Sequence, residues 1–127
     1  MSFSRELSVS VVVVGTNDSD LTSKSVESVL THTDKDVEVI LVDNGSKSGG
    51  LGKLIDKFRD TRVSILSVGA NRSFSEGSNI GAESATGEIL VFLNNNVMVT
   101  ENWLAPLVQE LQANPSAGAV GPKFLYP

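Results

Sequence analysis

The chain of 127 residues can hold one hydrophobic core but is short for two ordinary domains. A hydrophobic fraction of 40%, a charged fraction of 20% and a formal net charge of -5 with scattered basic residues are typical of a globular protein and argue against a nucleic acid partner. The absence of cysteine excludes disulfides and thiolate metal sites, and a single histidine, His32, excludes a multi-histidine zinc site. No apolar run approaches the ~20 residues of a membrane-spanning helix, so we expect a cytoplasmic protein.

The first segments of the chain alternate between strand and helix patterns. The β-branched run from Val9 to Val14 predicts a strand buried on both faces, and the turn residues after it end that strand. A helix with one apolar face should follow, and its apolar residues are Leu21, Val26, Val29 and Leu30. This strand and helix form the first βα unit.

The pattern then repeats. A second strand is predicted from Val37 to Val42, and the loop 43–46 separates it from another helix. That helix carries Leu51, Leu54, Ile55 and Phe58 at i, i+3, i+4 and i+7. A third strand is predicted from Val63 to Val68.

The second half of the chain continues this alternation. Ser73 and Glu76 have the spacing of a capping box, which predicts a helix running to about Ala85. A fourth strand is expected over 88–93, and Pro106 requires the next helix to begin near Asn102, because proline fits only the first turn. Residues 117–120 could add a short strand. Together these units predict an α/β fold, a Rossmann-like and mostly parallel sheet with helices on both faces.

Ligands of open parallel sheets bind beyond the carboxyl ends of the strands. The loops expected at those ends are polar, and they contain Thr16-Asn17, Asp43-Asn44, Asn71-Arg72 and Asn94-Asn95-Asn96. No G-x-G-x-x-G follows the first strand and no G-x-x-x-x-G-K-[ST] occurs, so neither a dinucleotide fingerprint nor a P-loop is indicated. A nucleotide in this crevice would have to be held in another way.

Several segments resemble a known family in order and spacing. They are "LSVSVVVVGTND", "VESVL", "VEVILVDNGS", "NRSFSEGSNIGAESATGEILVFLNNNV" and "WLAPLVQEL". In them the chain resembles the N-terminal, nucleotide-sugar-binding portion of family 2 glycosyltransferases with the GT-A fold, close to the rhamnosyltransferase-like members. The resemblance implies an inverting enzyme, as in polysaccharide biosynthesis, that transfers a sugar from a nucleoside diphosphate donor to the hydroxyl of a carbohydrate or lipid-linked acceptor. It also implies Mg²⁺ or Mn²⁺ on the diphosphate.

The resemblance also suggests residues that bind the nucleotide sugar. Asp43 matches the aspartate that binds the base, with a turn or capping role as its alternative. Asn17, preceded by Thr16, matches a base or ribose contact, and Asn44 and Asn95 lie in the matching loops. Arg72 could approach the base or a phosphate, or could be a solvated surface side chain. Asn79 lies with Gly77 and Gly81 in a pattern that close packing explains as well as ligand contact does.

The amides after the fourth strand depart from the family pattern. Asn94 and Asn96 stand where the family places metal-binding acids, and Asn96 matches the aspartate expected on the cation. An amide oxygen can coordinate a cation but brings no charge, so metal affinity should fall. Three explanations stay open: donor binding through a phosphate-bound metal with help from the amides, a degenerate non-catalytic module, or a variant of a parent with aspartate. A simple turn formed by the three asparagines is the structural alternative.

The remaining expectations concern organisation and partners. We expect residues 1–127 to form a single α/β domain whose natural fold continues beyond Pro127, so that this portion could bind a donor without turning it over. A degenerate nucleotide-sugar-binding or regulatory module is the alternative function. No catalytic residue can be named. We expect no membrane-spanning segment and keep peripheral membrane association open.

Overall fold

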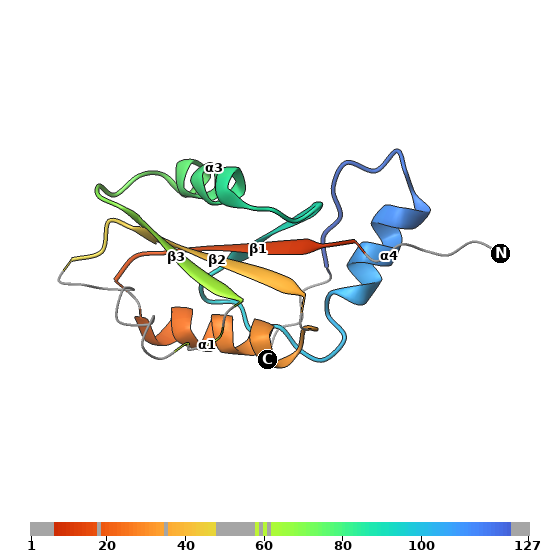
Figure 1. The fold of residues 1–127 in the computed structure, drawn as a ribbon, viewed down its shortest axis with the longest axis horizontal. Helices are drawn as coiled ribbons and strands as arrows, with labels where there is room; N and C mark the ends of the chain where they lie inside the picture. The colour runs from red at the N-terminus through yellow and green to blue at the C-terminus, as the bar shows by residue number, and fades with distance from the viewer. Residues whose placement is uncertain are drawn as a thin grey trace.

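The computed structural model describes residues 7–17, 19–34, 36–47, 58, 60 and 62–122. Its four strands form one parallel sheet with the order β3-β2-β1-β4. The strands are β1 (Val9–Gly15), β2 (Val37–Asn44), β3 (Val63–Val68) and β4 (Ile89–Asn94). Helix α1 (Ser19–Thr31) lies on one face of the sheet and α3 (Phe74–Ser84) on the other, while α4 (Ala105–Ala113) lies beyond the end where the strands begin (Figure 1). The predicted α/β fold is confirmed.

Strand β1 is buried on both faces because its alternate valines enter two different cores. The core on one face packs around α1, and its buried members are Val9, Val11, Val13, Val26, Val29, Val37, Val39, Leu41, Leu93 and Val99. The core on the other face lies under α3 and consists of Val12, Val14, Ile40 and Val42, with Ala85 packed against it. A continuous β-branched run is the pattern expected of such a central parallel strand.

Helix α3 begins as its capping box predicts. The Ser73 side chain accepts a hydrogen bond from the backbone N–H of Glu76, at 3.1 Å. The helix then packs closely on the sheet, because a Cβ at Gly77 would lie 2.9 Å from a methyl of Val14. Of the two explanations for these glycines, the structure therefore supports close packing.

Two expectations near the end of the described chain are wrong. The last helix begins at Ala105 instead of Asn102, so that Pro106 occupies its first turn, and Asn102 has a φ of 58°, which no α-helix contains. Residues 117–120 form no strand. Their Ala-Gly composition has little strand preference, and the only strand paired with β4 is β1 within the described residues.

The predicted helix between β2 and β3 lies mostly outside the described residues. Leu51, Leu54 and Ile55 belong to that part, whereas Phe58 is described and packs against the core on the α1 side. None of the helices in the described ranges is long and apolar enough to cross a membrane.

Candidate functional site

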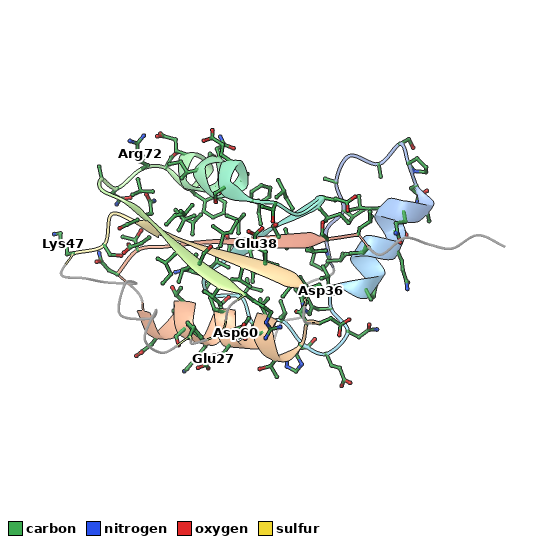
Figure 2. The ribbon with its side chains drawn as sticks, in the orientation of Figure 1. Glu27, Asp36, Glu38, Lys47, Asp60 and Arg72 are labelled. Carbon is green, nitrogen blue, oxygen red and sulfur yellow. The ribbon has the colours of Figure 1, made fainter. Side chains whose placement is uncertain are left out.

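The strands end together at one edge of the sheet. The parallel registers pair Gly15 with Asp43, Val14 with Asn94 and Asn44 with Val68. The loops that follow all four strands therefore leave from the same edge, as the sequence predicted. Figure 2 shows Lys47 and Arg72 at this end of the molecule, with Asp36 toward the opposite end. We call this the carboxyl edge.

The loops after β1 and β2 are joined by hydrogen bonds. Thr16 donates its hydroxyl to the backbone oxygen of Asn44 at 2.9 Å. Asn17 donates its backbone N–H to the Ser46 hydroxyl at 3.0 Å, and its side-chain oxygen accepts from the backbone N–H of Lys47 at 2.8 Å. Asn17 also has a φ of 58°, a left-handed conformation that asparagine tolerates better than most residues. Thr16 and Asn17 thus lie together beside the end of β2.

Asn44 joins the loop after β2 to the loop after β3. Its side-chain oxygen accepts from the backbone N–H of Arg72 at 2.9 Å, and its side-chain nitrogen donates to the backbone oxygen of Arg72 at 2.7 Å. The same nitrogen lies 3.4 Å from the side-chain oxygen of Asn71. Because both polar atoms of a nearly buried amide are used in this way, Asn44 positions Arg72, and direct ligand contact by Asn44 stays a prediction.

Asp43 is the carboxylate of this network. It is 7% exposed, and its Oδ1 accepts a hydrogen bond from the backbone N–H of Ser46 at 3.1 Å. Asp43 therefore forms the turn contact that is the alternative to base binding. A carboxylate has two oxygens and about four acceptor sites, so one turn contact leaves capacity for a ligand N–H. Base binding by Asp43 stays a prediction.

Arg72 and Asn79 are both exposed. The Arg72 guanidinium lies 3.5 Å from a Glu76 carboxylate oxygen, and the two side chains are 51% and 58% exposed. Such a surface pair is weak, so an anion could compete for this arginine. Asn79 lies in α3, and no hydrogen bond within the described residues connects its side chain with the strand-end loops. Its proposed contact with a ligand stays a prediction.

The three amides at the end of β4 have different surroundings. Asn95 is half-buried and donates its side-chain N–H to the Thr22 hydroxyl of α1 at 3.2 Å. Asn94 and Asn96, on either side of it, are exposed. The turn that carries them is closed by a hydrogen bond from the backbone N–H of Val97 to the backbone oxygen of Asn94, at 3.1 Å. The middle amide is therefore an anchor, and the outer two face solvent.

Sequence reasoning missed the row of hydroxyls in α1 that holds this turn. Ser25 donates to the backbone oxygen of Val97 at 2.6 Å, and Ser28 accepts from the backbone N–H of Val99 at 3.0 Å. With Thr22 they lie at i, i+3 and i+6, which is one side of a helix. Three hydroxyls at that spacing were the available signal, but nothing local identified the loop after β4 as their partner.

The family resemblance implies a divalent cation at the position of these amides. Mg²⁺ is usually bound by one or two carboxylates together with substrate phosphates. Asn94 and Asn96 offer only neutral oxygens, and no group of three His, Asp or Glu side chains that could hold a metal ion occurs among the described residues. These amides do not fit a divalent cation held by the chain itself.

A hollow at the opposite edge of the sheet is unsuited to binding an anion. It lies between the end of α1 and α4, and its lining includes Asp34, Asp36, Glu101 and His32. The three carboxylates would repel a diphosphate, and the hollow lies where the strands begin. The carboxyl edge is the better candidate site.

Comparisons with known proteins support the sequence resemblance. The family described as "Glycosyl transferase family 2" matches residues 10–126. The chain is 36% identical over 121 residues to the O-antigen biosynthesis protein RfbC of Myxococcus xanthus. The aligned region covers 94% of this chain and 9% of that protein. The chain is 30% identical over 120 residues to the glycosyltransferase GlyG of Streptococcus pneumoniae serotype 4, covering 93% of this chain and 40% of that protein.

A solved structure shows the same fold. The crystal structure of S. aureus TarS matches 86% of this chain and 20% of its own, with a TM-score of 0.73 and 18% sequence identity. At that identity the likeness concerns the fold alone. The chain spans less than half the length of each of these three proteins.

Proposed function

Because this chain belongs to glycosyl transferase family 2, we propose that its carboxyl edge binds a nucleoside diphosphate sugar and that the whole protein transfers the sugar to an acceptor hydroxyl. One observation carries the proposal. The polar residues predicted from the sequence, Thr16, Asn17, Asp43 and Arg72, lie in one hydrogen-bonded set of loops at the edge where such folds bind ligands. The amides at the end of β4 lie at the same edge.

The arrangement suggests how a donor would lie. The Asp43 carboxylate can accept an N–H of the base, since uracil, thymine and guanine each carry one, and Asn17 and Thr16 stand beside it. The end of β4 is two strands away from the end of β2, about 9–10 Å at the usual strand spacing. A nucleoside diphosphate carries its base and its phosphates on opposite sides of the ribose, so its phosphates can reach Asn94 and Asn96.

The proposed reaction is a single displacement. An acceptor hydroxyl oxygen attacks the anomeric carbon, the bond from that carbon to the diphosphate oxygen breaks, and the nucleoside diphosphate leaves with the electron pair. The hydroxyl proton passes to a base that this chain does not identify. Hydrogen-bond donors at the carboxyl edge would stabilise the charge that develops on the leaving diphosphate.

The finer features belong to the same proposal. They are a carbohydrate or lipid-linked acceptor, a cytoplasmic location, and a role for this chain as the donor-binding portion of a longer enzyme. RfbC is named for O-antigen biosynthesis, and another relative, 31% identical over 100 residues, is a glucosyl-dolichyl phosphate glucuronosyltransferase of Haloferax volcanii. These names support a glycan or lipid-linked acceptor, and they favour the transferase over the non-catalytic module.

The first experiment measures thermal unfolding of the chain with UDP, GDP and dTDP. A nucleotide at ~100 times its Kd should add about 2.7 kcal/mol of stability, which raises the midpoint by several degrees in a domain of this size. We expect one nucleotide to give this shift. Absence of a shift with all three, in a chain shown to be folded, would contradict donor binding by this chain.

A pair of variants then tests the role of Asp43. Asp43→Asn keeps an oxygen for the Ser46 N–H but removes the charge, so it should weaken nucleotide binding about tenfold or more while leaving the fold intact. Asp36→Asn is the control, because it makes the same change at an exposed position near the opposite end of the sheet (Figure 2). Equal affinities of the two variants would show that Asp43 serves the turn alone.

A further inference from the structure

The end of β4 presents two exposed amides held by a fixed turn. The Asn95 side chain is hydrogen-bonded to Thr22. Ser25 and Ser28 are hydrogen-bonded to the backbones of Val97 and Val99. The turn is thereby attached to α1 at three points, which leaves Asn94 and Asn96 as its exposed polar side chains. A polar pair on a rigid support is suited to ligand binding, because little ordering is needed when the ligand arrives.

Amide and carboxylate side chains act oppositely on a diphosphate. A carboxylate and a phosphate repel each other, so acids at this position need a cation between them and the ligand. The side-chain nitrogen of asparagine carries two N–H donors, which can bond phosphate oxygens directly. An amide in place of an acid therefore removes the negative charge that attracts a cation and also the repulsion that made the cation necessary.

The buried carboxylate of the edge does not replace the missing acids. Asp43 ends β2, which is separated from β4 by β1, and its Oδ1 is held by the Ser46 backbone. Adjacent strands are about 4.8 Å apart, so these two strand ends are separated by about 9–10 Å. In the proposed function the Asp43 carboxylate binds the base, so it is not counted as a ligand of a cation at the phosphates.

We propose that Asn94 and Asn96 bind the donor diphosphate directly, so that nucleotide binding by this chain does not depend on a divalent cation. The inference rests on the proposed function, since it names how that site holds its ligand. Arg72, at the same edge and only loosely paired with Glu76, provides the cationic side chain of the site. The wild-type chain should then bind its nucleotide with the metal removed.

The test is a calorimetric titration of UDP, GDP and dTDP into the chain, once with EDTA and once with Mn²⁺. We expect the nucleotide that binds to have the same Kd in both conditions to within about threefold. The double variant Asn94→Asp with Asn96→Asp should bind at least about tenfold more weakly in EDTA and recover with Mn²⁺. Asn102→Asp adds the same kind of charge at the opposite edge and should bind as the wild type does in both conditions.

The outcomes separate the two proposals. If wild-type binding requires Mn²⁺, this inference is overturned while donor binding stands. If the double variant binds as well as the wild type in EDTA, the amides do not touch the diphosphate and the inference fails again. If no nucleotide binds in either condition to a folded chain, the proposed function itself fails and this inference fails with it.

Discussion

Gly45 stands where the loops after β2 and β3 meet. Its φ is +76°, and a Cβ there would lie 2.5 Å from the backbone nitrogen of Asn71. A side chain at this position would be both strained and in collision with the backbone that Asn44 holds in place. The "NG" pair, which elsewhere signals a hairpin, here allows two loops of a parallel sheet to touch.

Gly81 provides a sharper test of packing at the residue scale. Alanine in place of glycine normally stabilises a helix by about 1 kcal/mol, but a Cβ at Gly81 would lie 2.4 Å from a methyl of the buried Val12. We expect Gly81→Ala to lower the free energy of unfolding by about 1–3 kcal/mol, as overpacking of a core does. Urea unfolding followed by circular dichroism measures this change.

A matched glycine gives the control for that experiment. Gly118 is exposed, and a Cβ there meets nothing within 4 Å. Gly118→Ala should therefore keep the unfolding midpoint of the wild type. If Gly81→Ala were equally harmless, the approach of α3 to β1 would be looser than described.

At the scale of elements, Arg62 joins the end of α1 to the start of β3. Its guanidinium donates to the backbone oxygens of Leu30, Thr33 and Asp34, each at 3.3 Å, and is held by Asp60 at 2.8 Å. These carbonyls lie in and just beyond the last turn of α1, where helix oxygens lack partners within the helix. One planar side chain thus caps a helix and fixes it against the neighbouring strand.

Removal of this side chain should destabilise the chain. We expect Arg62→Ala to lower the free energy of unfolding by about 1–3 kcal/mol, because three carbonyls and a carboxylate lose a charged donor. Arg62→Lys should recover only part of the loss, since an ammonium cannot reproduce the planar fork. Urea unfolding of both variants, beside the half-exposed Arg72→Ala, measures the difference. A loss no larger than that of Arg72→Ala would show that the cap is unimportant.

At the scale of the whole molecule, Glu38 connects separate segments of the chain near the start of the sheet. Its carboxylate accepts hydrogen bonds from the Ser10 hydroxyl of β1 and from the backbone N–H and hydroxyl of Thr86, which lies between α3 and β4. Burial raises the pKa of Glu38, but these hydrogen bonds outweigh it and leave the pKa below its usual value. The ionised form of Glu38 is therefore the one whose hydrogen bonds join β2 to β1 and to the segment between α3 and β4.

This shift makes stability depend on pH. A carboxyl group whose pKa is lower in the folded state stabilises the fold above its unfolded pKa of about 4.3, and that contribution is lost as the pH falls through the folded value. Asp60 adds to the loss, because hydrogen bonds from Arg62 lower its pKa to about 2. We expect the free energy of unfolding to fall between about pH 5 and pH 2, and less steeply in Glu38→Gln. Parallel curves for the two proteins would contradict this role of Glu38.

Local signals in the sequence predicted most of the elements because each depends on neighbours a few positions away. The β-branched run gave β1, and Ser73 with Glu76 gave the start of α3. The start of α4 was misplaced because a proline shows only that it lies in the first turn, whereas Asn102 leaves the helical conformation. A proline limits the start of a helix to within about one turn and does not identify the first residue.

By itself the sequence determined the α/β class, the four strands and the polar loops at their ends, since apolar period and turn chemistry act over a few residues. Tertiary structure alone decided the strand order and the hydrogen-bond partners of the polar side chains. Asn44 is occupied by Arg72, 28 positions away, and Asn95 by Thr22, 73 positions away, which separates these anchors from the exposed Asn94 and Asn96. Identical amides have different surroundings because their hydrogen-bond partners are distant in the sequence and meet only in the folded sheet.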